Sequence, residues 1–248
     1  MRTSLPHIWK PATSYNDRQG GAEVDMLVLH YTGMVSAEAA AERLCDPDIE
    51  VSCQYLVDLD GTIVQMVEEQ HRAWQAGKSS WHGVADNNSR SIGIEIQNKG
   101  HEWGYHPFPE VQMDAVEALC LDILKRHKIA ARDVVGHSDI APGRKLDPGE
   151  LFDWERLGKA GIGHWVEPAP PEPGQFLQMG DQGEPVEALQ TMFALYGYGI
   201  EANGLYDQHT HDVVFAFQQH WRQARCDGVA DVSTIKTLRN LIAALPGS

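Results

Sequence analysis

The stretch SIGIEIQN, residues 91–98, decides how the chain must fold, because it alternates apolar and polar side chains with a period of two. This period is typical of a β-strand, in which successive side chains point to opposite faces of a sheet. Ile92, Ile94 and Ile96 would share one face, and Glu95 would lie on the other. A strand with such an apolar face needs a covering layer, so a sheet packed against helices is expected.

The segments on either side alternate between strand-like and helix-like patterns, which predicts an α/β domain with a mixed central sheet flanked by helices. Strand patterns occur at MLVLHYT (residues 26–32), at DVVGH (residues 133–137) and in SCQYLVDLDGTIVQMV (residues 52–67), which reads as a hairpin turning at Asp60 and Gly61. Helix patterns occur at SAEAAAERLCD (residues 36–46), with Ser36 as its N-cap, and at PEVQMDAVEALCLDILKRHK (residues 109–128).

A proline-rich run, VEPAPPEPGQ, divides the chain, because its four prolines prevent regular structure and favour a stiff, extended linker. We therefore predict a first domain at residues 1–165, a linker at residues 166–174 and a second domain at residues 175–248. In the second, NGLYDQHT (203–210) and DGVADVST (227–234) share one pattern, each ending in a Thr that could cap a following apolar helix. A third helix pattern precedes them, which predicts a small three-helix domain.

Composition excludes several classes of function. The chain has 248 residues and a net charge of −15, so it lacks the basic footprint of a protein whose main partner is nucleic acid. It contains no apolar run near the roughly 20 residues of a membrane span. The N-terminal residues show no apolar core of a signal peptide, so a cytoplasmic location is expected. The four cysteines include no CxxC pair and predict no disulfide framework.

Three residues are able to bind a metal, and they lie at the ends of strand-like segments or in a loop that follows one. His30 closes MLVLH, His137 follows DVVG, and Asp147 lies in the loop rich in Pro and Gly that comes next. Metal hydrolases typically use three such ligands and leave one position open. With 12 histidines in the chain, a chance arrangement and structural roles for these histidines are the alternatives.

Two further polar residues could take part in chemistry at such a metal. Glu95 is a carboxylate inside an otherwise apolar strand, so it either faces solvent or enters a site, where it could act as a general base. Lys145 lies two residues before Asp147 and could stabilise an oxyanion, although a lysine in a loop is usually solvated.

Five stretches also carry a resemblance, and they occur in this order: VLHYT, VSCQYLVDLDGTIVQMV, RAWQAGKSSWHG, NNSRSIGIEIQNKG and GHSDIAPGRKLDPG. Together they resemble the zinc-dependent type-2 family of N-acetylmuramoyl-L-alanine amidases, which includes phage amidases and peptidoglycan recognition proteins. The resemblance runs from about residue 7 to residue 165. Residues 175–245 are similar to the small three-helix peptidoglycan-binding domain.

The resemblance implies roles by position. His30, His137 and Asp147 match the zinc ligands, Glu95 matches the catalytic acid and base, and Lys145 matches a lysine that assists at the carbonyl oxygen. Many relatives have His where this chain has Gln54. That position is not a ligand in the family, so the departure leaves the zinc triad unaffected.

The implied reaction is hydrolysis of the amide bond between N-acetylmuramic acid, or its 1,6-anhydro form, and L-alanine of the stem peptide. The partners would be peptidoglycan or soluble anhydro-muropeptides. Trp74 and Trp81 are predicted as aromatic platforms for the substrate, with core packing as the alternative. Asn88 and Arg90 are predicted to bind the acidic stem peptide, with surface turn positions as the alternative.

Several alternatives stay open at this point. The wall-binding domain favours the cell envelope, whereas the missing signal favours the cytoplasm. Some relatives of the family bind peptidoglycan without cutting it, so a non-catalytic binder or sensor is one rival. An amidohydrolase for another small amide, with the helical domain as an oligomerisation element, is a second. The sequence does not indicate an oligomeric state.

Overall fold

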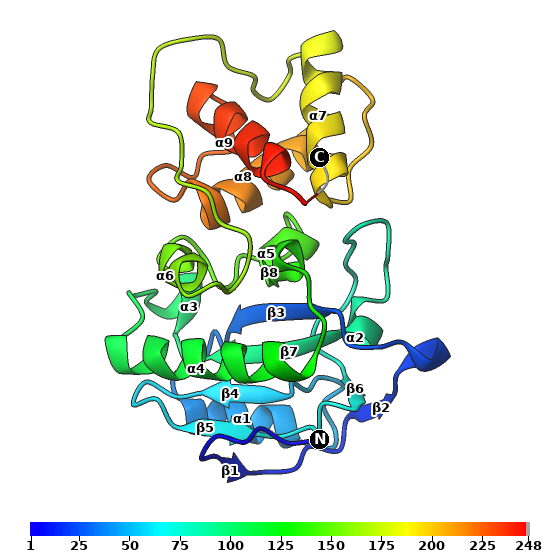
Figure 1. The fold of residues 1–248 in the computed structure, drawn as a ribbon, viewed down its shortest axis with the longest axis vertical. Helices are drawn as coiled ribbons and strands as arrows, with labels where there is room; N and C mark the ends of the chain where they lie inside the picture. Colours follow the sequence, from blue (N-terminus) through cyan, green and yellow to red (C-terminus); the bar gives the residue numbers. More distant parts are fainter. Residues whose placement is uncertain (247–248) are drawn as a thin grey trace.

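The computed structural model describes residues 1–246; positions 247 and 248, the end of the predicted second domain, lie outside the described residues. An α/β part, residues 1–165, forms the lower portion of the molecule in Figure 1, and a helical part, residues 175–246, lies above it. The strands and the three long C-terminal helices thus lie in different parts of the molecule, while the predicted domain bounds stay a prediction. In the part of the chain that the structure describes, no helix is long and apolar enough to cross a membrane.

The central sheet is mixed, because β4 and β5 form an antiparallel hairpin while the other neighbouring strands run parallel. Its strand order is β1-β5-β4-β7-β3-β8. The strands are β1 (Ile8–Trp9), β3 (Met26–Tyr31), β4 (Tyr55–Val57), β5 (Ile63–Gln65), β7 (Ser91–Ile96) and β8 (Val134–Gly136). A second, two-stranded sheet pairs β2 (Tyr15–Asp17) with β6 (His71–Ala73). The predicted strands and the predicted hairpin are confirmed.

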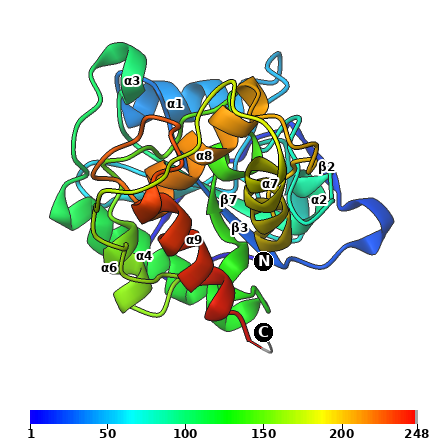
Figure 2. The same cartoon turned by 90° about the horizontal axis from the view of Figure 1, so that it is seen from above.

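Two helices cover the sheet from opposite sides. The helix α4 (Glu110–Arg126) lies in front of the sheet in Figure 1 and α1 (Ala37–Cys45) behind it, and the view from above in Figure 2 agrees. Ile92, Ile94 and Ile96 pack into one buried cluster with the apolar side of α4, as the period of two predicts. Ser36 caps α1 by accepting a hydrogen bond from the backbone N–H of Ala39. Six short helices join these elements: η1 (Gln19–Gly21), α2 (Asn87–Arg90), α3 (Gly100–Trp103), η2 (Ala131–Asp133), α5 (His137–Ile140) and α6 (Trp154–Lys159).

The helical part consists of α7 (Glu184–Tyr196), α8 (Gln208–Trp221) and α9 (Val232–Ala243). The two repeated turns precede α8 and α9, as predicted. Their capping residues differ from the prediction: Asp207 and Asp231 are the N-caps, and each accepts from the backbone N–H of a Thr, Thr210 or Thr234. An Asp at this position accepts more strongly than a Thr hydroxyl would, because it carries the charge that a helix N-terminus favours.

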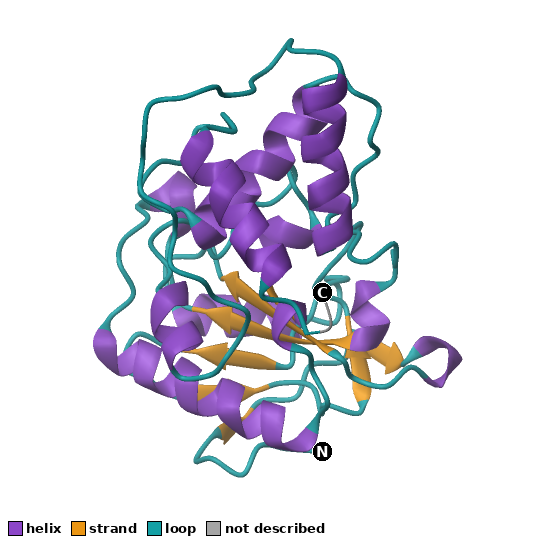
Figure 3. Ribbon diagram, turned by 45° about the horizontal axis from the view of Figure 1, so that its top comes forward, coloured by secondary structure: helices purple, strands orange, loops and turns teal. Residues whose placement is uncertain are grey.

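The two parts are not held apart by the proline-rich segment. Residues 166–174 are irregular, as predicted, but the helical part packs directly onto the sheet, with its helices above the strands in Figure 3. Met26 and Val28 of β3 belong to the same buried cluster as Phe193 and Phe217 of the helical part. The predicted linker therefore joins two parts whose apolar side chains share one buried cluster.

Candidate metal centre

Three side chains from separate segments meet beyond the end of β3. His30 is the fifth residue of β3, His137 begins α5, and Asp147 lies in the loop that follows. The Nδ1 atoms of the two histidines are 2.9 Å apart, and each lies 3.0 Å from Oδ2 of Asp147. All three side chains are buried. The structure thus brings together the triad that the sequence predicts.

The hydrogen bonds on the outer side of each imidazole show what the three inner atoms can do. Nε2 of His30 lies 2.6 Å from Oε1 of Gln75, and Nε2 of His137 lies 3.1 Å from the carbonyl oxygen of Ala76. Both oxygens can only accept, which favours a proton on each Nε2 and a lone pair on each Nδ1. Nη2 of Arg144 also lies 3.3 Å from Nε2 of His137, a longer contact than the one to the carbonyl oxygen of Ala76. Two lone pairs and a carboxylate oxygen at these distances repel one another unless a cation lies between them. The donor set therefore fits a metal ion such as zinc.

The third ligand is held in its charged form. Burial alone would raise the pKa of Asp147, but positive charge and donors at the positions of His137 and His30 outweigh it and hold that pKa well below its usual range; a bound cation would supply that positive charge when both imidazoles are neutral. The backbone carbonyl of Asp147 also accepts a hydrogen bond of 2.9 Å from the N–H of Ser138. This bond joins the segment that carries His137 to the segment that carries Asp147.

Glu95 lies beside the triad, because β7 and β3 pair in parallel with Glu95 directly opposite His30. Its Oε2 atom is buried and has no hydrogen-bond partner among the described residues. Burial raises the pKa of Glu95 to about 7, with the charge of Asp147 adding to the effect and His30 and Lys145 opposing it. A carboxyl group with this pKa can both accept and return a proton near neutral pH.

A cavity of about 730 Å³ opens over this group of residues. Its lining includes the three triad residues, Glu95 and Lys145. Three further cations, Arg43, Lys99 and Arg144, and two large aromatic side chains, Tyr31 and Trp103, also line it. Trp103 is 64% exposed, so it is accessible to a ligand. The cavity combines a buried polar centre with a cationic and aromatic rim.

The two tryptophans predicted as platforms lie elsewhere. Trp81 is fully buried between the two parts, where its ring packs 5.1 Å from that of Tyr198 and its Nε1 donates to Asp133. The indole of Trp74 donates to Asn16. Neither residue lines the cavity. The core-packing alternative holds for Trp81, because the helical part covers it.

The two predicted polar contacts also have other partners. Asn88 is buried, and its Oδ1 accepts from the backbone N–H groups of Gln75 and Ala76 at 3.0 and 2.7 Å. It therefore holds the loop that supports both histidines. Arg90 forms an ion pair of 2.6 Å with Asp25. Both residues are structural in this fold and lie outside the lining of the cavity.

The sequence reasoning missed Gln75, which orients His30. The amide of Gln75 is itself fixed, because its Nε2 donates to Oγ of Ser91 at 2.6 Å. The side chain of Gln75 passes close to β7 at Gly93, because a Cβ added to Gly93 would lie 2.9 Å from Cγ of Gln75. Gly93 inside β7 was the sequence signal that could have indicated this contact, because a glycine inside a strand often marks the close approach of another group. Arg144 and Trp103 also line the cavity, but no pattern or spacing in the sequence singled them out as site residues.

Two family descriptions match the chain. The family described as N-acetylmuramoyl-L-alanine amidase matches residues 20–150, which include the triad, Glu95 and Lys145. A family described as a peptidoglycan binding domain matches residues 182–238, which include the three helices α7, α8 and most of α9.

Individual proteins are similar over more of the chain. The N-acetylmuramoyl-L-alanine amidase AmiD of Escherichia coli is 36% identical over 85% of this chain and 79% of its own length. The 1,6-anhydro-N-acetylmuramyl-L-alanine amidase AmpD of Haemophilus influenzae is 32% identical over 57% of this chain and 85% of its own length.

Two solved structures share the fold. The structure of AmiD from E. coli in complex with anhydro-N-acetylmuramic acid-L-Ala-D-γ-Glu-L-Lys has a TM-score of 0.78 and 32% identity, covering 93% of both chains. The structure of AmpDh3 from Pseudomonas aeruginosa has a TM-score of 0.74 and 29% identity, covering 100% of both chains. The similarity to both therefore includes the α/β part and the helical part.

Proposed function

Because this chain belongs to the N-acetylmuramoyl-L-alanine amidase family, we propose that it works with a zinc ion held by His30, His137 and Asp147. Its reaction is hydrolysis of the amide bond between N-acetylmuramic acid, or its 1,6-anhydro form, and L-alanine of the stem peptide. The observation that carries the zinc assignment is the convergence of two Nδ1 lone pairs and one carboxylate oxygen within 3.0 Å. These ligands match the nitrogen and oxygen donors that catalytic zinc prefers.

Zinc at this site supplies a Lewis acid, which polarises a carbonyl group and makes water more acidic. The chain's own residues then handle the protons and the charge. Glu95 accepts a proton from the attacking water and returns it to the nitrogen of the leaving L-alanine, a task suited to its pKa of about 7. Lys145 lines the same cavity, where its ammonium group can stabilise negative charge that develops on the carbonyl oxygen.

The remaining lining of the cavity supports a role in substrate binding. We assign the exposed indole of Trp103 to the apolar face of the sugar, because an aromatic ring packs well against such a surface. Arg43, Lys99 and Arg144 line the same cavity and would pair with the carboxylates of the stem peptide. In a chain with net charge −15, this gathering of cations at one cavity favours an acidic ligand.

Two observations support different forms of the substrate. The similar structures of AmiD and AmpDh3 have been solved with anhydromuramyl peptides, which supports a soluble anhydro-muropeptide. The match of residues 182–238 to a peptidoglycan binding domain supports the intact wall. A soluble fragment as substrate would favour the cytoplasm, and the intact wall would favour the envelope. Both locations stay predictions.

Mass spectrometry of the products decides among these forms. The full chain is incubated with intact sacculi and with a soluble anhydro-muropeptide, each with and without a zinc chelator, and a His137→Ala variant is the matched control. We expect a chelator-sensitive release of a peptide that begins with L-alanine, and none from His137→Ala. Cleavage that persists in His137→Ala or in the chelator would contradict the zinc assignment. Cleavage of the soluble fragment alone would favour the cytoplasm, and cleavage of sacculi would favour the envelope.

A further inference from the structure

The segment that carries His137 rests on the helical part, and one buried carboxylate makes the connection. Asp139 is the third residue of α5, two positions after His137, and it is fully buried. Its Oδ1 accepts from the hydroxyl of Tyr198 at 2.7 Å, and its Oδ2 lies 2.7 Å from Nδ1 of His220. Both partners belong to the helical part. A buried carboxylate is tolerated only with such partners, and the helical part supplies both of its side-chain partners.

The same carboxylate fixes the backbone next to the metal ligand. Oδ2 of Asp139 also accepts from the backbone N–H of Gly136 at 2.8 Å. Gly136 precedes His137 and ends β8, so this bond sets where α5 leaves the sheet. With four residues, α5 is a single turn, and an isolated turn of helix has little stability of its own. Its position depends on the groups that hold Asp139.

The donors from the helical part are themselves immobilised. The ring of His220 lies between Trp154 of the α/β part and Trp221, with centroid distances of 3.6 and 3.5 Å. The ring of Tyr198 packs against Trp81 and Phe193. This ring packing restricts the positions of both donors, so they present a fixed pair of hydrogen-bond partners to the carboxylate of Asp139.

The loop after α5 follows the same surface. A Cβ at Gly143 would lie 2.2 Å from a carboxylate oxygen of Asp212 in α8, so the loop touches that helix closely. Farther along, Gln219 of α8 donates to Glu150 at 3.2 Å. Asp147 lies between these two points of contact. Because Ser138 also bonds to the carbonyl of Asp147, a shift of α5 would displace both His137 and Asp147.

We propose that Asp139 is a positioning residue through which Tyr198 and His220 of the helical part hold His137 and Asp147 in the geometry that binds zinc. The helical part is then a component of the metal centre in addition to any part it plays in wall binding. This inference rests on the zinc site proposed above. It predicts that residues outside the catalytic cavity control the affinity for zinc.

The test uses the full chain and three variants that each remove one buried donor. Tyr198→Phe and His220→Phe delete a donor to Asp139 while keeping an aromatic ring in place. Tyr206→Phe is the matched control, because the hydroxyl of Tyr206 is buried inside the helical part and donates to the carbonyl of Gly228. Zinc dissociation constants are measured by competition with a chelator, melting temperatures are measured on the metal-free proteins, and activity is measured with limiting and excess zinc.

We expect Tyr198→Phe and His220→Phe to bind zinc about 10-fold more weakly than the parent, in line with other indirect supports of metal ligands. Excess zinc should restore much of their activity, and Tyr206→Phe should bind zinc as the parent does. Equal zinc affinity in all three variants and the parent would overturn the inference and leave Asp139 as a contact that only joins the two parts. If His220→Phe does not fold, Tyr198→Phe decides alone. A failure of the zinc site itself shows separately, as a parent that binds zinc no better than His137→Ala, and it removes this inference too.

Discussion

His30 and Glu95 occupy directly paired positions on two neighbouring parallel strands, β3 and β7. Paired residues of parallel strands point to the same face of a sheet. The register of the sheet therefore places the carboxyl group that would move protons beside a metal-binding imidazole. On that face, apolar side chains flank the pair: Leu56 packs with α1, and Val28 packs with the helical part.

Replacing Glu95 with Gln should separate catalysis from metal binding. Glu95→Gln keeps the shape of the side chain but removes the group that accepts the proton, so kcat should fall by a factor of about 10² to 10⁴. Zinc content, measured by atomic emission, should stay at the level of the parent because the three ligands are unchanged. Glu38→Gln, on the exposed side of α1, is the matched control. A Glu95→Gln protein with normal kcat would exclude Glu95 as the acid and base.

Lys145→Met should weaken the stabilisation of the oxyanion. Removing one such group typically lowers kcat by a factor of about 10² to 10³, and steady-state kinetics on an anhydro-muropeptide measure it. KM should change less, because the charge on the carbonyl oxygen develops only in the transition state. Lys128→Met, at an exposed site after α4, controls for the loss of a positive charge. A rise in KM with unchanged kcat would assign Lys145 to substrate binding instead.

Gln75→Ala should weaken zinc binding without touching a ligand. The variant removes the oxygen that lies 2.6 Å from Nε2 of His30 and fixes which nitrogen faces the metal. Loss of such an orienting group commonly lowers metal affinity about 10- to 100-fold. Chelator competition gives the affinity, with the exposed Gln19→Ala as control. Parent-like affinity in Gln75→Ala would show that packing alone orients His30.

Trp103→Ala should impair binding of the sugar and leave the chemical step intact. An aromatic contact contributes about 0.5–1.5 kcal/mol, which corresponds to an increase in KM of roughly 2- to 13-fold. Kinetics with an anhydro-muropeptide measure it. Phe176→Ala removes an aromatic side chain of similar exposure, 52%, from the helical part and serves as control. The assignment fails if the two variants have the same KM.

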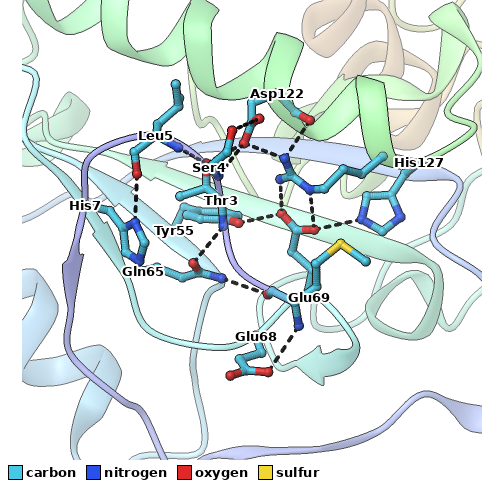
Figure 4. A network of polar contacts seen from close by, with 12 residues as sticks. Thr3, Ser4, Leu5, His7, Tyr55, Gln65, Glu68, Glu69, Asp122 and His127 are labelled. Carbon is cyan, nitrogen blue, oxygen red and sulfur yellow. Dashed lines mark hydrogen bonds and ion pairs between the residues drawn. The ribbon is translucent and has the colours of Figure 1, made fainter.

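Stability in acid should depend on Glu69, which lies in the polar network of Figure 4. Burial alone would raise the pKa of Glu69, but hydrogen bonds from His127, Arg126 and Tyr55 outweigh it and lower that pKa to about 2. A lowered pKa means that the network stabilises the fold fully above about pH 4.5, the ordinary pKa of a glutamate, and loses this contribution as the pH falls toward 2.

The shift corresponds to about 3 kcal/mol of unfolding free energy. Glu69→Gln should be less stable than the parent at pH 7, and its stability should fall less between pH 4.5 and pH 2. Urea unfolding at a series of pH values gives the comparison, with the exposed Glu50→Gln as control. Parallel pH curves for parent and Glu69→Gln would show that other carboxylates govern acid unfolding.

Local patterns predicted the elements of the fold well, because period and capping are properties of neighbouring residues. The alternation around Glu95 and the Ser36 cap of α1 are examples. The convergence of His30 and His137 was also predictable, since they lie near the ends of β3 and β8, which are neighbours in the sheet. Asp147 lies in the loop after α5, and its place beside them depends on the course of that loop.

The packing between the two parts was not predictable in the same way. Trp81 lies in a stretch that could equally serve a groove or a core, and only the docking of the helical part decides between them. The supporting roles of Gln75 and Asn88 depend on side-chain contacts across separate segments. No periodicity records such contacts.

The two repeated turns of the helical part are held by the same set of hydrogen bonds. Gln190 in α7 and Gln218 in α8 each donate through Nε2 to a carbonyl of the following turn and to the hydroxyl of its Thr, Thr210 or Thr234. The matching hydrogen bonds mean that each turn is held by the helix that precedes it, α7 for the first turn and α8 for the second. Because each turn is secured from within the helical part, the outward side of α8 is left to contact a neighbour, and His220 of α8 reaches Asp139 in the α/β part.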